Sequence, residues 1–218
     1  MKNLLKTPKN PVKKHRAKKI KTEIEFKWQI KNKLQFKLFA DITKKLKAKM
    51  AKLKKIKNED FYLDSENFEF KKQNSACRIR KTGKKLALCI KKANKIKNGL
   101  AKRSEIVIEL PKITAINCAL KKVNETNLIP SKLNVIFKII NNRKTSKLIY
   151  KKSVSSLCFD DVKIYAGSKI IPMKEIELEF IKGSLSDFKN FTKEITKKTG
   201  LKPAKISKVR TAFSALSD

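Results

Sequence analysis

The stretch Glu23-Ile24-Glu25-Phe26-Lys27 alternates charged and apolar side chains in the manner of a β-strand. Because successive side chains of a strand point to opposite faces, its two glutamates and its lysine share one face, and its apolar residues share the other with Trp28. The stretch Glu175-Ile176-Glu177-Leu178-Glu179-Phe180 repeats the pattern with three acids. Together the two stretches hold five of the 19 acidic residues in the chain. The scarce acids are therefore concentrated on two strand faces, each of which could line a site or face water.

The overall charge of the chain is strongly positive. Its 218 residues include 56 Lys plus Arg against 19 Asp plus Glu, which gives a net charge of +37. Such a charge favours a polyanionic partner: a nucleic acid, a polyphosphate, a nucleotide or an anionic membrane. The length and the 40% share of hydrophobic residues predict one domain with a sizeable core, since closed β structures often reach this size.

The cysteines and the apolar runs restrict the cellular setting. None of the four cysteines forms a CxxC pair, so the sequence indicates neither a zinc site nor a disulfide framework. This composition favours a reducing, cytoplasmic compartment. The apolar runs are too short to span a membrane, and the N-terminus lacks the apolar core of a secretory signal.

Residues 1–21 form a separate, basic stretch. They carry nine Lys or Arg and one His without any acid, and Pro8 and Pro11 interrupt any helix. We interpret them as a disordered basic arm or an added leader, more typical of a solvated tail than of a nucleic-acid anchor. Residues 22–218 are predicted to form one domain.

The pattern beyond the arm predicts helices around a set of strands. Apolar residues from Phe39 to Ile56 recur at steps of three and four, which predicts an amphipathic helix packed on a sheet with its lysines outward. A second helix begins at Ser184 and ends at Gly200, and a short helix covers about 113–123. Further strands are predicted at 61–64, 76–80, 86–91, 103–109, 133–140, 148–153, 154–159 and 175–180.

The charged faces of these strands each carry mainly one sign of charge. Glu23 and Glu25 are acidic, whereas Arg78 and Arg80 share a basic face. If the sheet closes into a barrel, these faces line a tunnel with cationic and acidic walls. Arginine and lysine neutralise phosphate oxygens, and carboxylates hold hard divalent cations, so such a tunnel suits a chain of phosphates with bound metal. The alternative is that Arg78 and Arg80 lie on a strand face exposed to solvent. Arginine is much rarer than lysine in this chain, so its presence at both positions argues against that alternative.

An ordered set of short motifs resembles the CYTH domain, the triphosphate tunnel metalloenzyme superfamily, from about Thr22 to Phe213. In chain order the motifs are Glu23-Ile24-Glu25-Phe26-Lys27, Tyr62-Leu63-Asp64-Ser65, Ala76-Cys77-Arg78-Ile79-Arg80, Leu88-Cys89-Ile90-Lys91, Arg103-Ser104-Glu105, Arg143, Phe159-Asp160 with Ala166-Gly167, Glu175 to Gly183, Thr199-Gly200-Leu201-Lys202-Pro203 and Ser207-Lys208-Val209-Arg210. The last three elements, from Glu175 onward, are most similar to the bacterial inorganic triphosphatase branch. The sequence departs from the family pattern at Asp161-Val162 and at Thr211-Ala212-Phe213.

The resemblance implies an α+β fold, an eight-stranded antiparallel closed β-barrel with helices packed outside, that hydrolyses a triphosphate with Mg²⁺ or Mn²⁺. It implies that the phosphates are bound by Lys27, Arg78, Arg80, Lys91, Arg103, Arg143 and Lys208. It implies that metal is bound by Glu23, Glu25, Asp160, Glu177 and Glu179. It gives catalytic roles to Glu177, Glu179 and Lys27, and it implies that Glu105 holds the basic residues in place. Of the three acids in its strand, Glu175 is the weakest candidate for a site residue, and no role is assigned to it.

The resemblance leaves the substrate open. Inorganic tripolyphosphate, hydrolysed with release of orthophosphate, is the favoured reading, while a longer polyphosphate, thiamine triphosphate and an RNA 5′ end are alternatives. Class IV adenylate cyclase shares the fold and the metal chemistry. A basic protein that binds polyphosphate or RNA without catalysis is the remaining alternative, and the basic surface and arm could bind nucleic acid non-specifically.

Overall fold

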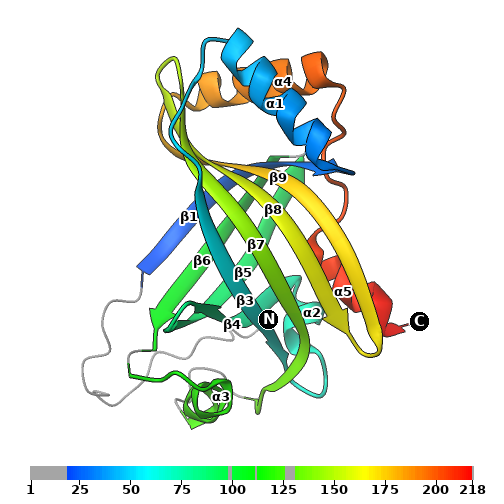
Figure 1. Cartoon of the computed structure of the whole chain (residues 1–218). Helices are drawn as coiled ribbons and strands as arrows, with labels where there is room; N and C mark the ends of the chain where they lie inside the picture. The colour runs from blue at the N-terminus through cyan, green and yellow to red at the C-terminus, as the bar shows by residue number, and fades with distance from the viewer. Residues whose placement is uncertain (1–18, 98–99, 111, 126–130, 218) are drawn as a thin grey trace.

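The computed structural model describes residues 19–97, 100–110, 112–125 and 131–217, and this part of the chain contains nine β-strands and five α-helices (Figure 1). The strands are β1 (Lys19–Ile30), β2 (Lys49–Met50), β3 (Lys54–Asp64), β4 (Ser75–Thr82), β5 (Lys85–Lys97), β6 (Leu100–Glu109), β7 (Asn134–Tyr150), β8 (Ser153–Ala166) and β9 (Lys169–Gly183). The helices are α1 (Lys33–Lys45), α2 (Glu69–Lys72), α3 (Ile116–Glu125), α4 (Leu185–Thr199) and α5 (Lys208–Ser217).

Eight of the strands close into a barrel. Their order is β7-β3-β4-β5-β6-β1-β9-β8, and β8 pairs back with β7, so the sheet has no open edge at that point. All the pairings are antiparallel, and the short β2 extends the sheet beside the end of β7. The predicted α+β fold with an eight-stranded antiparallel closed barrel is therefore confirmed.

The outer face of β1 is covered by two helices. Phe26 and Trp28 pack with Phe39 of α1 and Phe191 of α4 in one apolar cluster, and Trp28 is fully buried. The indole Nε1 of Trp28 donates a hydrogen bond to Oγ1 of Thr196 at 2.8 Å. Figure 1 shows α1 and α4 together over the same end of the barrel. The apolar face of β1 thus points out of the barrel, which leaves its charged face for the interior.

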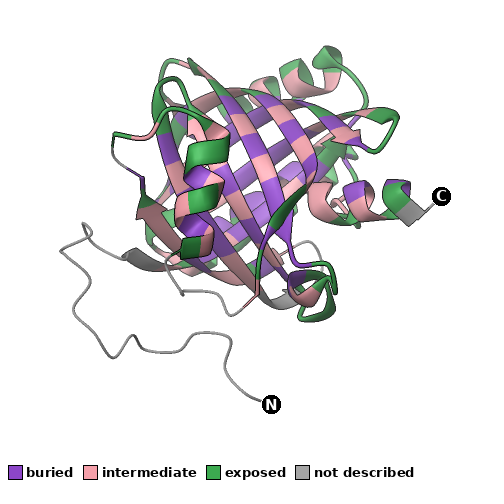
Figure 2. Cartoon of the chain, turned by 90° about the horizontal axis from the view of Figure 1, so that it is seen from below, coloured by how far each residue is buried: buried purple, intermediate pink, exposed green. Residues whose placement is uncertain are grey.

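The other helices lie toward the opposite end of the barrel. α3 packs Ala119 and Val123 on the outer faces of β4 and β5, next to Ile79 and Leu88. α5 instead packs on inward-facing side chains of β7 and β8, through Ala212 and its neighbours. Buried and partly exposed residues alternate along the strands in Figure 2, as expected of a sheet with two chemically different faces.

The predicted helix from Phe39 to Ile56 is wrong in its second half. α1 ends at Lys45, and the chain reverses at Lys47, which has a φ of 59°. Met50 then belongs to β2 and Ile56 to β3. Residues of β3 form backbone hydrogen bonds with both β4 and β7. This pairing stabilises a strand more than the helical spacing of a few apolar residues stabilises a helix.

The three strands predicted between 133 and 159 are in fact two long ones. β7 runs without interruption through Asn141, Asn142 and Arg143, a polar segment that the sequence pattern treats as a break. Asn141 is buried because it faces the barrel interior, where polar residues are expected in this fold. The turn comes later, between β7 and β8, at Lys151 with a φ of 49°. The final segment, Ser207-Lys208-Val209-Arg210, opens helix α5.

The predicted basic arm falls mostly on residues 1–18, which lie outside the described residues. Its last residues, Lys19 to Lys21, belong to β1. Among the residues that the structure describes, no helix is both long and apolar enough to cross a bilayer.

Candidate functional site

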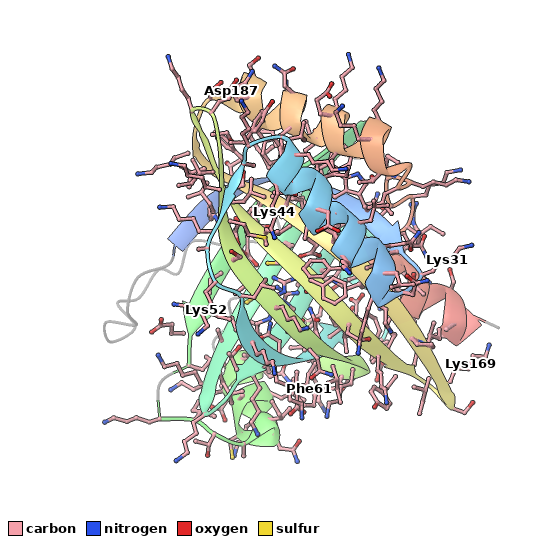
Figure 3. The ribbon with its side chains drawn as sticks, turned by 45° about the horizontal axis from the view of Figure 1, so that its top comes forward. Lys31, Lys44, Lys52, Phe61, Lys169 and Asp187 are labelled. Carbon is pink, nitrogen blue, oxygen red and sulfur yellow. The ribbon has the colours of Figure 1, made fainter. Side chains whose placement is uncertain are left out.

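The barrel encloses a cavity of about 940 Å³ whose lining is dominated by charged side chains. The residues of the predicted site that line it are Glu23, Glu25, Lys27, Arg78, Arg80, Lys91, Arg103, Arg143, Glu177, Glu179 and Lys208. Asp160 lies immediately behind this lining and is fully buried. Many other nitrogen-tipped side chains project outward around the barrel (Figure 3). The interior therefore gathers the predicted residues from seven strands and from α5.

Three carboxylates meet in the interior where β8 lies beside β9. Asp160 is directly opposite Glu175 in the strand register, and Glu177 follows on the same face. One oxygen from each of the three lies within 4.8 Å of the others, and all three residues are buried. The Nζ of Lys208 lies 2.6 Å from Oδ2 of Asp160, 2.5 Å from Oε1 of Glu175 and 2.9 Å from Oε1 of Glu177. A single lysine from α5 thus contacts all three acids.

Two further cations surround this group of carboxylates. Arg143 donates from Nε and Nη2 to both oxygens of Asp160, each at 2.7 Å, and from Nη2 to Oε2 of Glu177 at 2.5 Å. The Nζ of Lys27 lies 2.6 Å from Oε1 of Glu177 and 3.4 Å from Oε2 of Glu25. The bidentate pair fixes the guanidinium plane, which a lysine could not do.

Burial and charge act differently on neighbouring acids of this group. Burial, together with Glu177, raises the pKa of Glu175 to about 7, although Lys208 and Lys27 act in the opposite direction. Burial also disfavours the ionised form of Glu177, but Lys208, Lys27 and Arg143 outweigh it and hold its pKa well below the usual value. Burial lowers the pKa of both lysines, yet the surrounding carboxylates raise each above its usual value. The two lysines and Glu177 are therefore charged at neutral pH.

A second group of charges is centred on Asp60 of β3. Its two oxygens accept hydrogen bonds from Nε and Nη2 of Arg80, each at 2.7 Å, and Nη1 of Arg78 lies 3.4 Å away. Arg78 also donates to the hydroxyl of Tyr62 at 3.1 Å and lies 3.6 Å from Glu105. Burial opposes ionisation of Asp60, but Arg78 and Arg80 outweigh it and lower its pKa to about 2. Asp60 thus holds both predicted phosphate-binding arginines of β4.

The remaining predicted residues form ion pairs that join different strands of the barrel. Lys91 of β5 contacts Glu23 at 2.7 Å and Glu105 at 3.4 Å. Arg103 of β6 contacts Glu25 at 3.2 Å, and Lys21 pairs with Glu179. Glu105 contacts both Lys91 and Arg78, which agrees with the supporting role that the resemblance implies for it.

Sequence reasoning missed two acids of the interior, Asp60 and Glu175. Glu175 shares a strand face with Glu177, so its spacing was the available signal. Asp60 precedes Tyr62 by two residues and therefore shares its face, a signal hidden by the assignment of the preceding residues to a helix. Asp64, part of a quoted motif, accepts backbone hydrogen bonds from the N–H groups of Ser65 and of Phe70 and Lys71 in α2.

The donor set of the three-carboxylate group fits a hard divalent cation. Mg²⁺ and Mn²⁺ are bound in proteins mainly by carboxylate, carbonyl and water oxygens. Both oxygens of Glu175 are buried without a well-aligned hydrogen-bond donor, as is Oε1 of Glu25. The Nζ of Lys208 lies 2.5 Å from Oε1 of Glu175, and Nη1 of Arg103 lies 3.2 Å from Oε1 of Glu25. Oε2 of Glu175 has no hydrogen-bond donor among the described residues, and a bound cation would relieve the cost of burying it. Asp160, Glu175 and Glu177 could therefore hold the metal, with Glu25 nearby across Lys27.

Comparisons with known proteins agree with this geometry. The CYTH domain family model matches residues 21–213 of the chain. An inorganic triphosphatase from Haemophilus influenzae is 28% identical over 153 residues, which cover 67% of this chain and 44% of the relative. The chain thus matches less than half the length of that relative.

Two solved structures share the fold. A candidate adenylate cyclase from Bacillus halodurans has a TM-score of 0.60 at 21% identity, covering 89% of this chain and 98% of its own. An adenylyl cyclase candidate from Hippeastrum, described as having a dominant triphosphatase activity, also has a TM-score of 0.60, at 16% identity, covering 88% and 96%.

Proposed function

Because the chain belongs to the CYTH domain family, we propose that it is a metal-dependent triphosphatase that hydrolyses inorganic tripolyphosphate and releases orthophosphate. The observation that carries this proposal is the meeting of Lys27, Arg143 and Lys208 with three buried carboxylates inside a closed barrel. Cations are needed for the phosphate oxygens and carboxylates for a metal, and this interior supplies both. The relative from Haemophilus influenzae supports an inorganic substrate.

Seven cations of the lining are the proposed phosphate ligands. They approach the cavity from six elements, as Lys27 of β1, Arg78 and Arg80 of β4, Lys91 of β5, Arg103 of β6, Arg143 of β7 and Lys208 of α5. A linear triphosphate presents non-bridging oxygens in all directions around its axis, so cations on all sides match it better than a flat patch would. Each cation is already held by a carboxylate, and this fixes its position before the substrate arrives.

The acids of the interior have two proposed tasks. Glu23, Glu25, Asp160, Glu177 and Glu179 would hold Mg²⁺ or Mn²⁺ directly or through water, and Glu175 joins them from its position beside Asp160. The bound metal would draw charge from the phosphoryl group and lower the pKa of a bound water.

The reaction itself is a phosphoryl transfer to water. A water oxygen would bond to the terminal phosphorus while the bridging P–O bond breaks, giving orthophosphate and pyrophosphate, with the proton of water leaving on the products. Glu177 and Glu179 would orient the water, and Lys27 would offset the charge that develops on the transferred group. The closed barrel limits access of bulk water to these charges, which strengthens each interaction.

Phosphate release from tripolyphosphate tests the proposal. With Mg²⁺ or Mn²⁺ the purified protein should release orthophosphate, and Glu177→Gln and Arg78→Gln should each lower kcat about a hundredfold or more. Glu194→Gln and Lys193→Gln on α4, outside the barrel, are the matched controls. Equal activity of all four variants, or no release by the wild type, would reject the triphosphatase.

The net charge of +37 favours a second candidate, a protein that binds polyanions without catalysis. That candidate predicts steeply salt-dependent nucleic-acid binding that is unchanged by Glu177→Gln. ATP and thiamine triphosphate should be assayed as separate substrates, with both phosphate and cyclic nucleotide measured. Cyclic nucleotide from ATP would indicate a cyclase, and faster phosphate release from thiamine triphosphate than from tripolyphosphate would indicate a different triphosphatase.

A further inference from the structure

Three cations of the cavity lining differ from the rest in their partners. Lys71 of α2, Lys205 in the segment before α5 and Arg210 of α5 line the cavity and are exposed, and within the described ranges no carboxylate lies within 4.0 Å of their charged groups. The seven cations of the predicted site each have such a carboxylate. We call Lys71, Lys205 and Arg210 the α2/α5 rim. Its positive charge is not neutralised by the protein.

All three cations of the rim line one cavity, and Phe213 links Lys71 with Arg210. The Nζ of Lys71 lies 4.9 Å from the ring centroid of Phe213. Arg210 precedes Phe213 by three residues in the same helix, so the two share a face of α5. Ser207, which also lines the cavity, caps this helix by accepting a hydrogen bond from the backbone N–H of Arg210 at 3.2 Å. The first turn of α5 holds no acid, so its helix dipole adds positive potential on the same side.

The aromatic rings beside the rim are already engaged. Tyr62 is stacked on Phe137 with centroids 4.7 Å apart, and the guanidinium carbon of Arg78 lies 5.9 Å from the Tyr62 centroid. Phe213 has Lys71 over its ring and an edge contact with Phe137 at 5.2 Å. Recognition of a base commonly uses a free aromatic face. The surroundings of the rim therefore favour further phosphates over a nucleoside.

We propose that the α2/α5 rim binds the phosphates beyond the third of a linear inorganic polyphosphate, so that chains longer than tripolyphosphate are the better substrates. This inference rests on the proposed function. A polyphosphate chain repeats the same anionic oxygens along its length and brings no base that would need a stacking partner. Its first three phosphates would bind the cations of the interior that are paired with carboxylates. The phosphates beyond the third would bind the three rim cations, which have no carboxylate partner in the described part of the chain.

The experiment compares substrates of different length on matched variants. The rim variant Lys71→Gln/Lys205→Gln/Arg210→Gln should lower kcat/KM for a long linear polyphosphate about tenfold and leave kcat/KM for tripolyphosphate unchanged. The control Lys189→Gln/Lys193→Gln/Lys197→Gln removes the same charge from exposed positions of α4 and should change neither value. Wild-type protein should also prefer the long chain to ATP.

Several results would overturn the inference. An equal fall for both substrates, the same loss in the α4 control, or a preference for ATP that is reduced by the rim variant would each reject it. Calorimetric titration of long polyphosphate in EDTA tests the rim without turnover, and the rim variant should bind about tenfold more weakly. If wild type hydrolyses neither tripolyphosphate nor longer chains, the proposed function fails, while the metal-free titration still decides whether the rim binds the chain.

Discussion

The Nζ of Lys208, the first residue of α5, lies 2.6 Å from Oδ2 of Asp160 on β8. This ion pair fastens the C-terminal helix to the interior of the barrel instead of to its outer surface. Because the same lysine contacts Glu175 and Glu177, it offsets much of the repulsion among three buried acids. Lys208 therefore contributes both to the position of α5 and to the charge balance of the interior.

Lys208→Met should destabilise the protein in EDTA by about 3–5 kcal/mol, because it leaves buried carboxylates without their shared cation. Methionine keeps the unbranched apolar stem, so the loss reports on charge more than on packing. Urea unfolding gives the free energy, with Lys193→Met on the exposed face of α4 as the control. Equal unfolding midpoints for the two variants would show that the interior does not need this lysine.

Acid should remove the stability that Asp60 contributes. Its pKa is about 2 in the folded protein against a usual value of 3.8, so its contribution is fully present above about pH 4 and is lost as pH falls toward 2. At neutral pH this contribution is about 2 kcal/mol. The difference in unfolding free energy between wild type and Asp60→Asn should therefore shrink from pH 6 to pH 3.

The control for that experiment is Asp41→Asn, at an exposed position of α1. Its difference from the wild type should stay small at every pH. A pH-independent difference for Asp60→Asn would mean that the ion pairs with Arg78 and Arg80 do not contribute to stability.

Period-two alternation made the walls of the barrel predictable. In Glu23-Ile24-Glu25-Phe26-Lys27 each side chain has a fixed side once the strand is assigned, so Lys27 had to face away from Phe26. The same argument placed Arg78 and Arg80 on one face. Closure of the sheet was implied by the ordered family motifs and not by any single strand, since a half-exposed strand shows the same alternation.

The features that the sequence did not predict depend on contacts between segments that are distant in the chain. Lysine is so frequent in this chain that it occurs equally on the outer faces of helices and at the edges of strands, so it does not distinguish the two. The spacing of the apolar residues then predicts a helix through Ile56, where the structure has β3. Asn141 and Asn142 resemble a turn locally, yet pairing with both β3 and β8 holds them in a strand. The contact of Glu175 with Lys208 joins β9 to α5, and no local pattern contains such a pairing.

The packing of α4 on the barrel should depend on the hydrogen bond between Trp28 and Thr196. Thr196→Val keeps the shape but removes the acceptor, which leaves the buried indole N–H unpaired and should cost about 1–3 kcal/mol. Thr196→Ser keeps the hydroxyl and should cost less. Thermal or urea unfolding of the two variants gives the comparison, and a smaller loss for valine than for serine would contradict this role.

Metal binding should stabilise the folded protein through the three-carboxylate group. A ligand that binds only the folded state raises Tm as its concentration exceeds Kd, so MnCl₂ should raise the Tm of the wild type above its value in EDTA. Glu175→Gln should reduce this rise while costing the metal-free protein little, because burial beside Glu177 already disfavours the charged form of Glu175 and raises its pKa to about 7. Glu194→Gln on α4 should show the full rise. If the Glu175 variant shows it as well, the metal is bound elsewhere.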